Sequence, residues 1–379
     1  MRLDFFRGLA MLIIYVAHIP WNGWILWIPA RFGPSDAAEM FVFCSGFASA
    51  LAFGASFRRI GFAVGCLRIA NRCWQLYWAQ LCLVLAVAAL LWWSTEHLDT
   101  RDYIAQLNLR PVFDDTGRAL VGLATLSYVP NFFDILPMYI AVLAMMPVVM
   151  ALARIDWRLA AAVSAALWLV AFTTRIGPPA EWWSDRVWFF NPLSWQLLFY
   201  IGFAFASGWL RPPPASRRLT IAALMVVIGF VPVTFWWLVQ SVPLLEAAFA
   251  ALAPWTDKTF FGPLRLLHFM ALTYLALRLV EAVPAILTHP LSALVVKVGQ
   301  QALPVFLSSI LLGQIAAILL DVHGRNALTV TVQNLGGFAV LIAIAYLVDY
   351  LKAEPWRRPV PPSRAQDPAV PAASGLSPG

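Results

Sequence analysis

Long unbroken runs of apolar residues recur along the whole chain, and they limit what it can fold into. A run of about 17–25 apolar residues can cross a bilayer as a helix, whereas a spanning strand would alternate apolar and polar residues over about ten positions. Hydrophobic residues make up 61% of the 379 residues and charged residues only 12%, about half the charge of an ordinary soluble domain. The sequence therefore predicts an all-α, polytopic integral membrane helix bundle.

About ten membrane-spanning helices are expected, with boundaries accurate to a few residues. The segment 57–73 places four arginines among apolar residues and is predicted to form a separate amphipathic helix on the membrane surface. Residues 1–353 are thus expected to form one transmembrane domain, and the Pro-, Ala- and Ser-rich tail 354–379 is predicted to be disordered. The expected spans are 5–26, 37–56, 74–94, 135–153, 157–174, 193–210, 219–239, 262–280, 301–320 and 327–350.

The basic residues between these spans predict the orientation of the chain. Seventeen of the 26 lysines and arginines fall on one side of the expected bundle and nine on the other. By the positive-inside rule both termini are cytoplasmic, as in a multi-pass protein of a bacterial inner membrane. The net charge of +7 is then a topology signal, and nucleic acid is not an expected partner. The four cysteines lie in or beside apolar segments without CxxC spacing, so no metal site or disulfide framework is predicted.

The first expected span contains the clearest group of polar residues whose burial in a membrane costs free energy: Asp4, Arg7 and His18. Eleven residues of helix make three turns plus about 20°, so Arg7 and His18 share one face about 16 Å apart. Charged groups in hydrocarbon usually serve function, which makes His18 a candidate base and Arg7 a candidate anion contact. The alternative is that Arg7 snorkels to the interface and His18 packs ahead of Pro20.

The second expected span opens with Asp36, and Glu39 follows three residues later, a spacing typical of a capping box. Capping accounts for Asp36. Glu39 lies a turn deeper, on the same half of the membrane as His18, so we interpret it as the acidic partner that orients the imidazole. Ser45 and Gly46 follow, where small residues favour close helix packing.

Other polar residues at span ends are candidate substrate contacts, although capping or interhelical hydrogen bonds explain each of them equally well. Arg68 and Arg72 share a helix face and suit either anionic lipid phosphates or a phosphorylated cosubstrate. The loop tryptophans Trp182, Trp183, Trp188 and Trp255 suit interface anchoring or sugar stacking. No HExxH, GxSxG or P-loop appears in a fitting context. The candidate substrate contacts are Asp36, Asp134, Tyr139, Asn191 and Gln196.

Five segments in order carry a resemblance to a known family. Arg7, His18 and the following arginine-rich segment are similar to the transmembrane acyltransferases called acyltransferase family 3. Within that group, five sequence segments resemble the OpgC branch, which comprises succinyltransferases of osmoregulated periplasmic glucans. The segments are FFRGLAMLIIYVAHIP, PSDAAEMFVFCSGFASAL, ILPMYIAVLAMMPVV, FNPLSWQLLFYIGF and VGQQALPVFLSS, which extend from residue 5 to about 310.

The resemblance implies a membrane-embedded O-acyltransferase that takes an acyl group, most simply succinyl, from cytoplasmic acyl-coenzyme A (CoA) to a hydroxyl of a periplasmic glucan. It implies His18 as base and Arg7 as the motif cation, places the family's CSG motif on Ser45 and Gly46, and assigns Arg68 and Arg72 to CoA. That arginine pair departs from the family spacing of two intervening residues. Acyl-CoA would be a cosubstrate, and no permanently bound cofactor is implied.

Two other classes of function fit the same residues. A secondary transporter or flippase of a glycan or organic anion would use Arg7, His18 and Glu39 as a substrate and proton relay, although the sequence has no inverted repeats with paired broken helices. A structural scaffold would leave these three residues without a reason to be buried. Formation of a covalent ester separates the enzyme from both. The sequence does not specify the oligomeric state or the group that stabilises an oxyanion.

Overall fold

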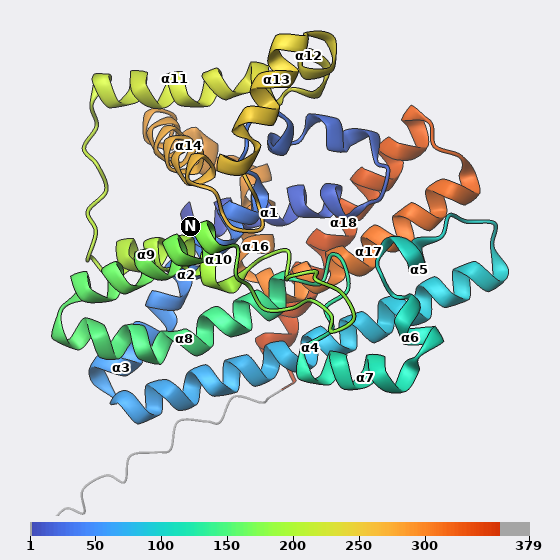
Figure 1. Cartoon of the computed structure of the whole chain (residues 1–379), viewed down its shortest axis with the longest axis horizontal. Coiled ribbons are helices and arrows are strands. Elements are labelled where there is room, and N and C mark those ends of the chain that lie inside the picture. The colour runs from blue at the N-terminus through green and yellow to red at the C-terminus, as the bar shows by residue number, and fades with distance from the viewer. Residues whose placement is uncertain (1, 357–379) are drawn as a thin grey trace, which may run out of the picture.

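The computed structural model describes residues 2–356, except for the side chain of Arg58, and most of these residues lie in helices joined by loops (Figure 1). Within this part of the chain no strand forms, and the one isolated bridge pairs Pro179 with Val187. The predicted all-α membrane bundle is therefore confirmed. The predicted disordered tail lies outside the described residues from 357 onward.

The long helices are joined by short helical turns. The longer helices are α1 (Arg2–His18), α2 (Ala37–Ser49), α4 (Phe62–His97), α7 (Thr116–Thr125), α8 (Ile135–Ile155), α9 (Trp157–Thr174), α10 (Pro192–Ala206), α11 (Arg217–Thr234), α13 (Pro243–Leu252), α14 (Pro263–Ala282), α16 (Pro290–Gln300), α17 (Ala302–His323) and α18 (Ala327–Lys352). The short ones are α3 (Ala55–Arg59), α5 (Tyr103–Gln106), α6 (Arg110–Asp114), α12 (Trp236–Ser241), α15 (Ala285–Thr288), the 3₁₀ turns η1 (Gly23–Trp27), η2 (Pro29–Arg31) and η4 (Ala253–Trp255), and the π-helical turn η3 (Ala50–Gly54).

Eight helical segments in the described chain are long and apolar enough to cross a membrane. The two remaining predicted spans correspond to α1, with 17 residues, and α10, with 15 residues. Both are packed on several sides by other helices: α1 lies against α2, α16 and α17, and α10 lies against α2, α8 and α9. Figure 1 shows α1 in the middle of the bundle. These two short helices therefore form its interior.

Several predicted boundaries are wrong, each for a local reason. The predicted surface helix 57–73 does not exist as a separate element, because the chain breaks at Gly61, whose φ of 121° suits glycine, and α4 then runs for 36 residues. The first span ends at His18 instead of 26, since Pro20 and the N-cap Asn22 start the η1 turn. The predicted span 219–239 ends at Thr234 and is followed by the separate helix α12.

Close packing of α2 on α10 depends on two glycines. A Cβ on Gly46 would collide with the backbone carbonyl of Phe199, and one on Gly202 would collide with that of Phe43. The packing role predicted for Gly46 is confirmed, because the two backbones touch where these residues cross. This contact fixes α2, and with it the residues at the start of α2 that face the candidate site.

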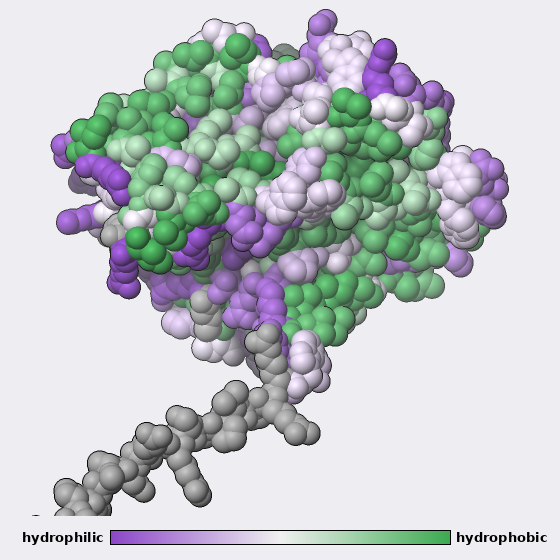
Figure 2. All heavy atoms as spheres, turned by 90° about the horizontal axis from the view of Figure 1, so that it is seen from below, coloured by the Kyte–Doolittle hydropathy of each residue, from purple (hydrophilic) through white to green (hydrophobic). Residues whose placement is uncertain are grey.

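The surface is consistent with a lipid-facing protein. Figure 2 shows broad hydrophobic areas across the face seen from below, with hydrophilic residues at its sides and in the lower middle of the view. Exposed large apolar side chains follow the outer faces of the helices, among them Met225 and Ile228 of α11 and Val332 and Leu335 of α18. Exposed apolar area of this extent is a membrane or partner surface, and the run of spanning helices makes it a membrane surface.

Candidate functional site

His18, the last residue of α1, lines a cavity of about 730 Å³. We call this hollow the His18 cavity. Its wall comes from α1, the start of α2, the segment 131–135 before and at the start of α8, the loop 185–190 and the loop 258–259. The imidazole lies edge-on to the rings of Phe132 and Phe306, with centroids 5.8 and 6.2 Å away. Its Nδ1 is buried and has no hydrogen-bond partner among the described residues, so the ring is held by packing and keeps a nitrogen for another molecule.

Lys258 brings a cation into the same cavity from the loop before α14. Its amino group pairs with the Asp36 carboxylate and also lies 5.7 and 5.6 Å from the ring centroids of Phe189 and Phe190. These contacts hold the ammonium group in the wall that it shares with His18. Because the described side chain is still 27% exposed, an anionic ligand has access to it.

Glu39 does not meet His18 in the structure, which contradicts the predicted pairing. The Glu39 carboxylate is fully buried. One of its oxygens lies 2.6–2.7 Å from two nitrogens of the Arg265 guanidinium, and the other accepts a hydrogen bond from the backbone N–H of Asp36 at 2.7 Å. Both oxygens are thus engaged inside the protein. A buried carboxylate needs such partners because unpaired burial is costly, and Arg265 on α14 meets that need where His18 does not.

Asp36 has the predicted capping role and also lines the His18 cavity. Its side chain accepts the N–H of Ala38 at 2.7 Å, which completes a capping box with Glu39. Burial alone would raise the pKa of the Asp36 carboxyl group, but the Lys258 and Arg265 cations outweigh it and hold that pKa below its ordinary value. Asp36 is therefore charged at neutral pH and keeps Lys258 in place.

Asp134, another predicted substrate contact, lines the cavity from the position just before α8. One carboxylate oxygen accepts the N–H of Phe189 at 3.1 Å. Burial raises the pKa of Asp134 to about 6, more than the Phe189 N–H and the Arg186 cation lower it. The carboxyl group therefore changes its charge within one or two pH units of neutrality while facing the same hollow as His18.

Three other predicted contacts have their polar groups engaged elsewhere and are not in the wall of the His18 cavity. Tyr139 shares a hydrogen bond of 3.3 Å with Ser49. Asn191 caps α10 by accepting the N–H of Leu193 and donates to the carbonyl of Ile176. Gln196 is joined to Ser164 by two hydrogen bonds. For these residues the structure shows the capping and interhelical roles that the sequence left open.

The predicted arginines lie away from His18. Arg7 lies about three helical turns before His18 on α1. It is half-buried, and its Nε has no hydrogen-bond partner among the described residues. Arg68, near the start of α4, donates to Ser56 and lies over the Phe53 ring, while Arg72 donates to Gln75. The structure gives the latter two local partners, and neither lines the cavity that His18 opens into.

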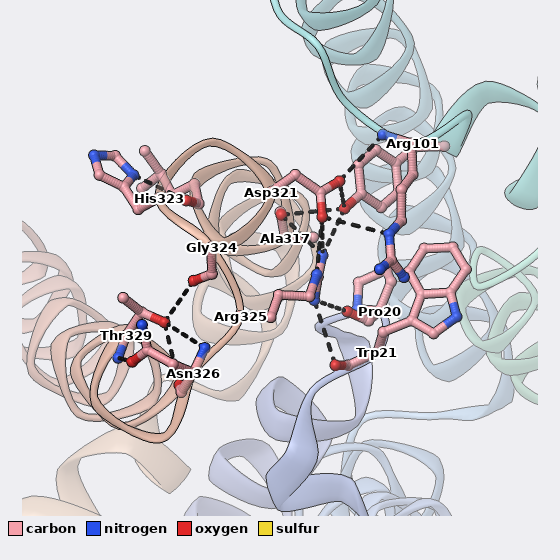
Figure 3. Close-up of polar contacts among 12 residues, drawn as sticks. Pro20, Trp21, Arg101, Ala317, Asp321, His323, Gly324, Arg325, Asn326 and Thr329 are labelled. Atoms are coloured by element: carbon pink, nitrogen blue, oxygen red, sulfur yellow. Dashed lines mark hydrogen bonds and ion pairs between the residues drawn. The ribbon is translucent and has the colours of Figure 1, made fainter.

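A cluster around Arg325 fixes the chain just beyond His18 (Figure 3). Its guanidinium donates to the Asp321 carboxylate, to the hydroxyl of Tyr103 at 2.8 Å and to the backbone carbonyl of Pro20 at 2.8 Å. Arg101 adds a cation contact to the ring of Trp21 at 4.6 Å. The cluster joins α17, α5 with the loop before it, and the segment after α1, so Arg325 fixes the backbone two residues beyond His18.

Sequence reasoning missed Lys258, Arg265 and Arg325. All three are among the few basic residues on the less basic side of the bundle. Their rarity on that side was the one feature of the sequence that could have pointed to them. Each pairs with a carboxylate: Asp36, Glu39 and Asp321 respectively. Among residues 2–356, no three or more His, Cys, Asp or Glu side chains gather closely enough to hold a metal ion.

Comparison with known proteins gives one result for nearly the whole chain. A family model described as OpgC protein matches residues 1–353. The chain belongs to the OpgC family. This confirms the predicted OpgC resemblance and supports a transferase that modifies a glucan, while the wider link to acyltransferase family 3 stays a prediction. No curated protein and no solved structure matches the chain significantly.

Proposed function

We propose that this OpgC-family protein transfers a succinyl group from succinyl-CoA to a hydroxyl of a periplasmic glucan in the bacterial inner membrane. The observation that carries the proposal is the His18 cavity, which presents an imidazole with a free buried nitrogen beside a lysine. A sugar hydroxyl needs a base to become a nucleophile, and imidazole suits this task near neutral pH. The Lys258 ammonium group in this wall suits an acyl chain that ends in a carboxylate.

In the proposed reaction His18 takes the proton of the sugar hydroxyl as its oxygen attacks the thioester carbonyl. The carbon–oxygen ester bond forms, the carbon–sulfur bond breaks, and the CoA thiolate leaves and receives the proton. Lys258 would hold the far carboxylate of the succinyl chain, exchanging part of its contact with Asp36. Asp134, which lines the same cavity, would face the acceptor hydroxyls.

The donor is proposed to enter from the Arg7 end of α1. The eleven residues between Arg7 and His18 rise about 16 Å, a distance that the long arm of CoA can bridge. The bias of basic residues supports a cytoplasmic location for the Arg7 end and for both termini. Arg7, and beyond it Arg68 and Arg72, are then the proposed phosphate contacts of CoA.

Formation of an ester tests the function directly. Purified protein, labelled succinyl-CoA and glucan are incubated together, and the glucan is analysed by mass spectrometry. We expect a succinyl ester and free CoA in equal amounts. Glucan that crosses a membrane unchanged, with no ester in any fraction, would instead support a transporter.

Lys258 should set the preference for a dicarboxylic acyl chain. We expect Lys258→Met to lower the ratio of succinyl to acetyl transfer by about tenfold to a hundredfold, because a hydrogen bond to a charged group contributes about 1.5–3 kcal/mol. Lys258→Arg keeps the cation and should retain most of the preference. Both ratios are measured with succinyl-CoA and acetyl-CoA as competing donors, and an unchanged ratio in Lys258→Met would remove this role.

A further inference from the structure

A second cavity of about 450 Å³ adjoins the His18 cavity. We call it the Trp236 cavity. Asp36 and Lys258 line both hollows, so the two cavities lie on either side of this ion pair. Its volume falls within the roughly 300–1,000 Å³ of small-molecule sites. A molecule that fills both cavities would therefore pass the Asp36–Lys258 pair.

The wall of the Trp236 cavity is built by α12 and α13 against the segment that follows α1. Figure 1 shows these two helices beside that segment. Phe235 stacks on Phe32 with ring centroids 5.4 Å apart and contacts Trp27 at 6.3 Å. These aromatic contacts hold α12 in place, and they leave the next residue, Trp236, in the cavity wall.

The lining combines aromatic surface with hydrogen-bonding groups. Trp236, Phe230 and Phe249 supply ring surface, and Thr234 and Gln240 supply hydroxyl and amide groups. The Nε1 of Trp236 is buried and has no hydrogen-bond partner among the described residues, although a buried indole N–H usually finds one. A ligand with an apolar face and an oxygen acceptor would cover the aromatic surface and accept the hydrogen bond of the Trp236 N–H.

The charges around this cavity are mostly compensated. Two of the three cations are paired with carboxylates, Lys258 with Asp36 and Arg265 with Glu39. Arg31 keeps its charge and donates its Nε to the backbone carbonyl of Ile25 at 3.3 Å. Such a wall favours a neutral polyhydroxylated ligand over a polyanion such as the nucleotide part of CoA. A glucosyl residue has this chemistry, because its ring presents C–H groups on a face and hydroxyls around its edge.

We propose that the Trp236 cavity is the acceptor subsite, which binds the glucosyl residue next to the one whose hydroxyl reaches His18. This inference rests on the proposed function. The ring of the neighbouring glucosyl residue lies against Trp236, and one of its oxygens accepts a hydrogen bond from the Nε1–H group. The glucan chain then passes the Asp36–Lys258 pair into the His18 cavity. The subsite thus selects a glucan chain over a single sugar.

The test compares two acceptors, a linear glucan oligosaccharide and methyl glucoside, with the full chain in detergent. We expect Trp236→Ala to raise KM for the oligosaccharide about tenfold and to leave KM for methyl glucoside and for succinyl-CoA unchanged. Trp237→Ala is the matched control, because Trp237 is 57% exposed and lies outside both cavity walls. Equal effects on both acceptors, or equal effects of the two variants, would overturn the subsite.

Two further measurements cover the remaining outcomes. If Trp236→Ala does not fold, Gln240→Leu should show the same split between acceptors, since Gln240 is exposed and lines the cavity. If the native protein transfers succinyl to no acceptor, the proposed function fails, and titration calorimetry with the oligosaccharide still decides the subsite. Weaker binding to Trp236→Ala than to Trp237→Ala supports it, and equal binding contradicts it.

Discussion

His18→Ala should lower succinyl transfer by about 10²–10⁴-fold, the usual loss when a general base is removed. The protein should still fold, because the imidazole contacts Phe132 and Phe306 only by ring edges and its Nδ1 bonds to no described group. Initial rates with saturating glucan and succinyl-CoA, together with the thermal unfolding midpoint in detergent, check both parts of this expectation.

The matched control is His97→Ala. His97 ends α4, is exposed, and bonds to the backbone carbonyl of Trp93. It should keep the native rate. A native rate in His18→Ala would show that His18 only packs. The same conclusion would follow if the variant folds poorly but its folded molecules keep the native activity.

Arg265→Met should lower the free energy of unfolding by about 3–5 kcal/mol, because it leaves the Glu39 carboxylate buried without its cation. The Arg265 side chain is 7% exposed and that of Glu39 is 0% exposed, so water cannot replace the lost partner. The variant should unfold at a clearly lower temperature than the native protein and accumulate poorly in membranes.

A double variant distinguishes the ion pair from general packing. Arg265→Met with Glu39→Gln removes both charges and should recover a substantial part of the lost stability. Arg218→Met is the control, since Arg218 is exposed on α11, and it should change little. If the double variant is no more stable than Arg265→Met alone, the buried charge of Glu39 is not the cause.

The sequence was sufficient to predict the class of fold, since helices in a bilayer must satisfy their backbone hydrogen bonds within long apolar runs. The boundaries were less predictable. Gly61 breaks the chain where arginines suggested a continuous surface helix, and α1 stops at His18 because the chain turns at Pro20 and Asn22. These are local backbone events that average hydropathy does not report.

For the site, the sequence singled out His18, Asp36 and Asp134, which line one cavity, but it did not predict the other residues of the cavity wall. The wrong pairing of Glu39 with His18 came from placing both on the same half of the membrane. Depth does not define direction around a helix axis, and Arg265, more than two hundred residues away in the chain, occupies the position beside Glu39. Lys258 is likewise brought to His18 only by the folding of the loop before α14.

Transfer across a sealed membrane tests the central claim most directly. Vesicles containing the reconstituted protein are loaded with glucan, and labelled succinyl-CoA is added only outside. We predict labelled succinyl ester on the enclosed glucan, free CoA in the outer solution, and neither in vesicles with His18→Ala. Ester that forms only when donor and glucan share one compartment, or intact succinyl-CoA found inside the vesicles, would contradict transfer through the His18 cavity.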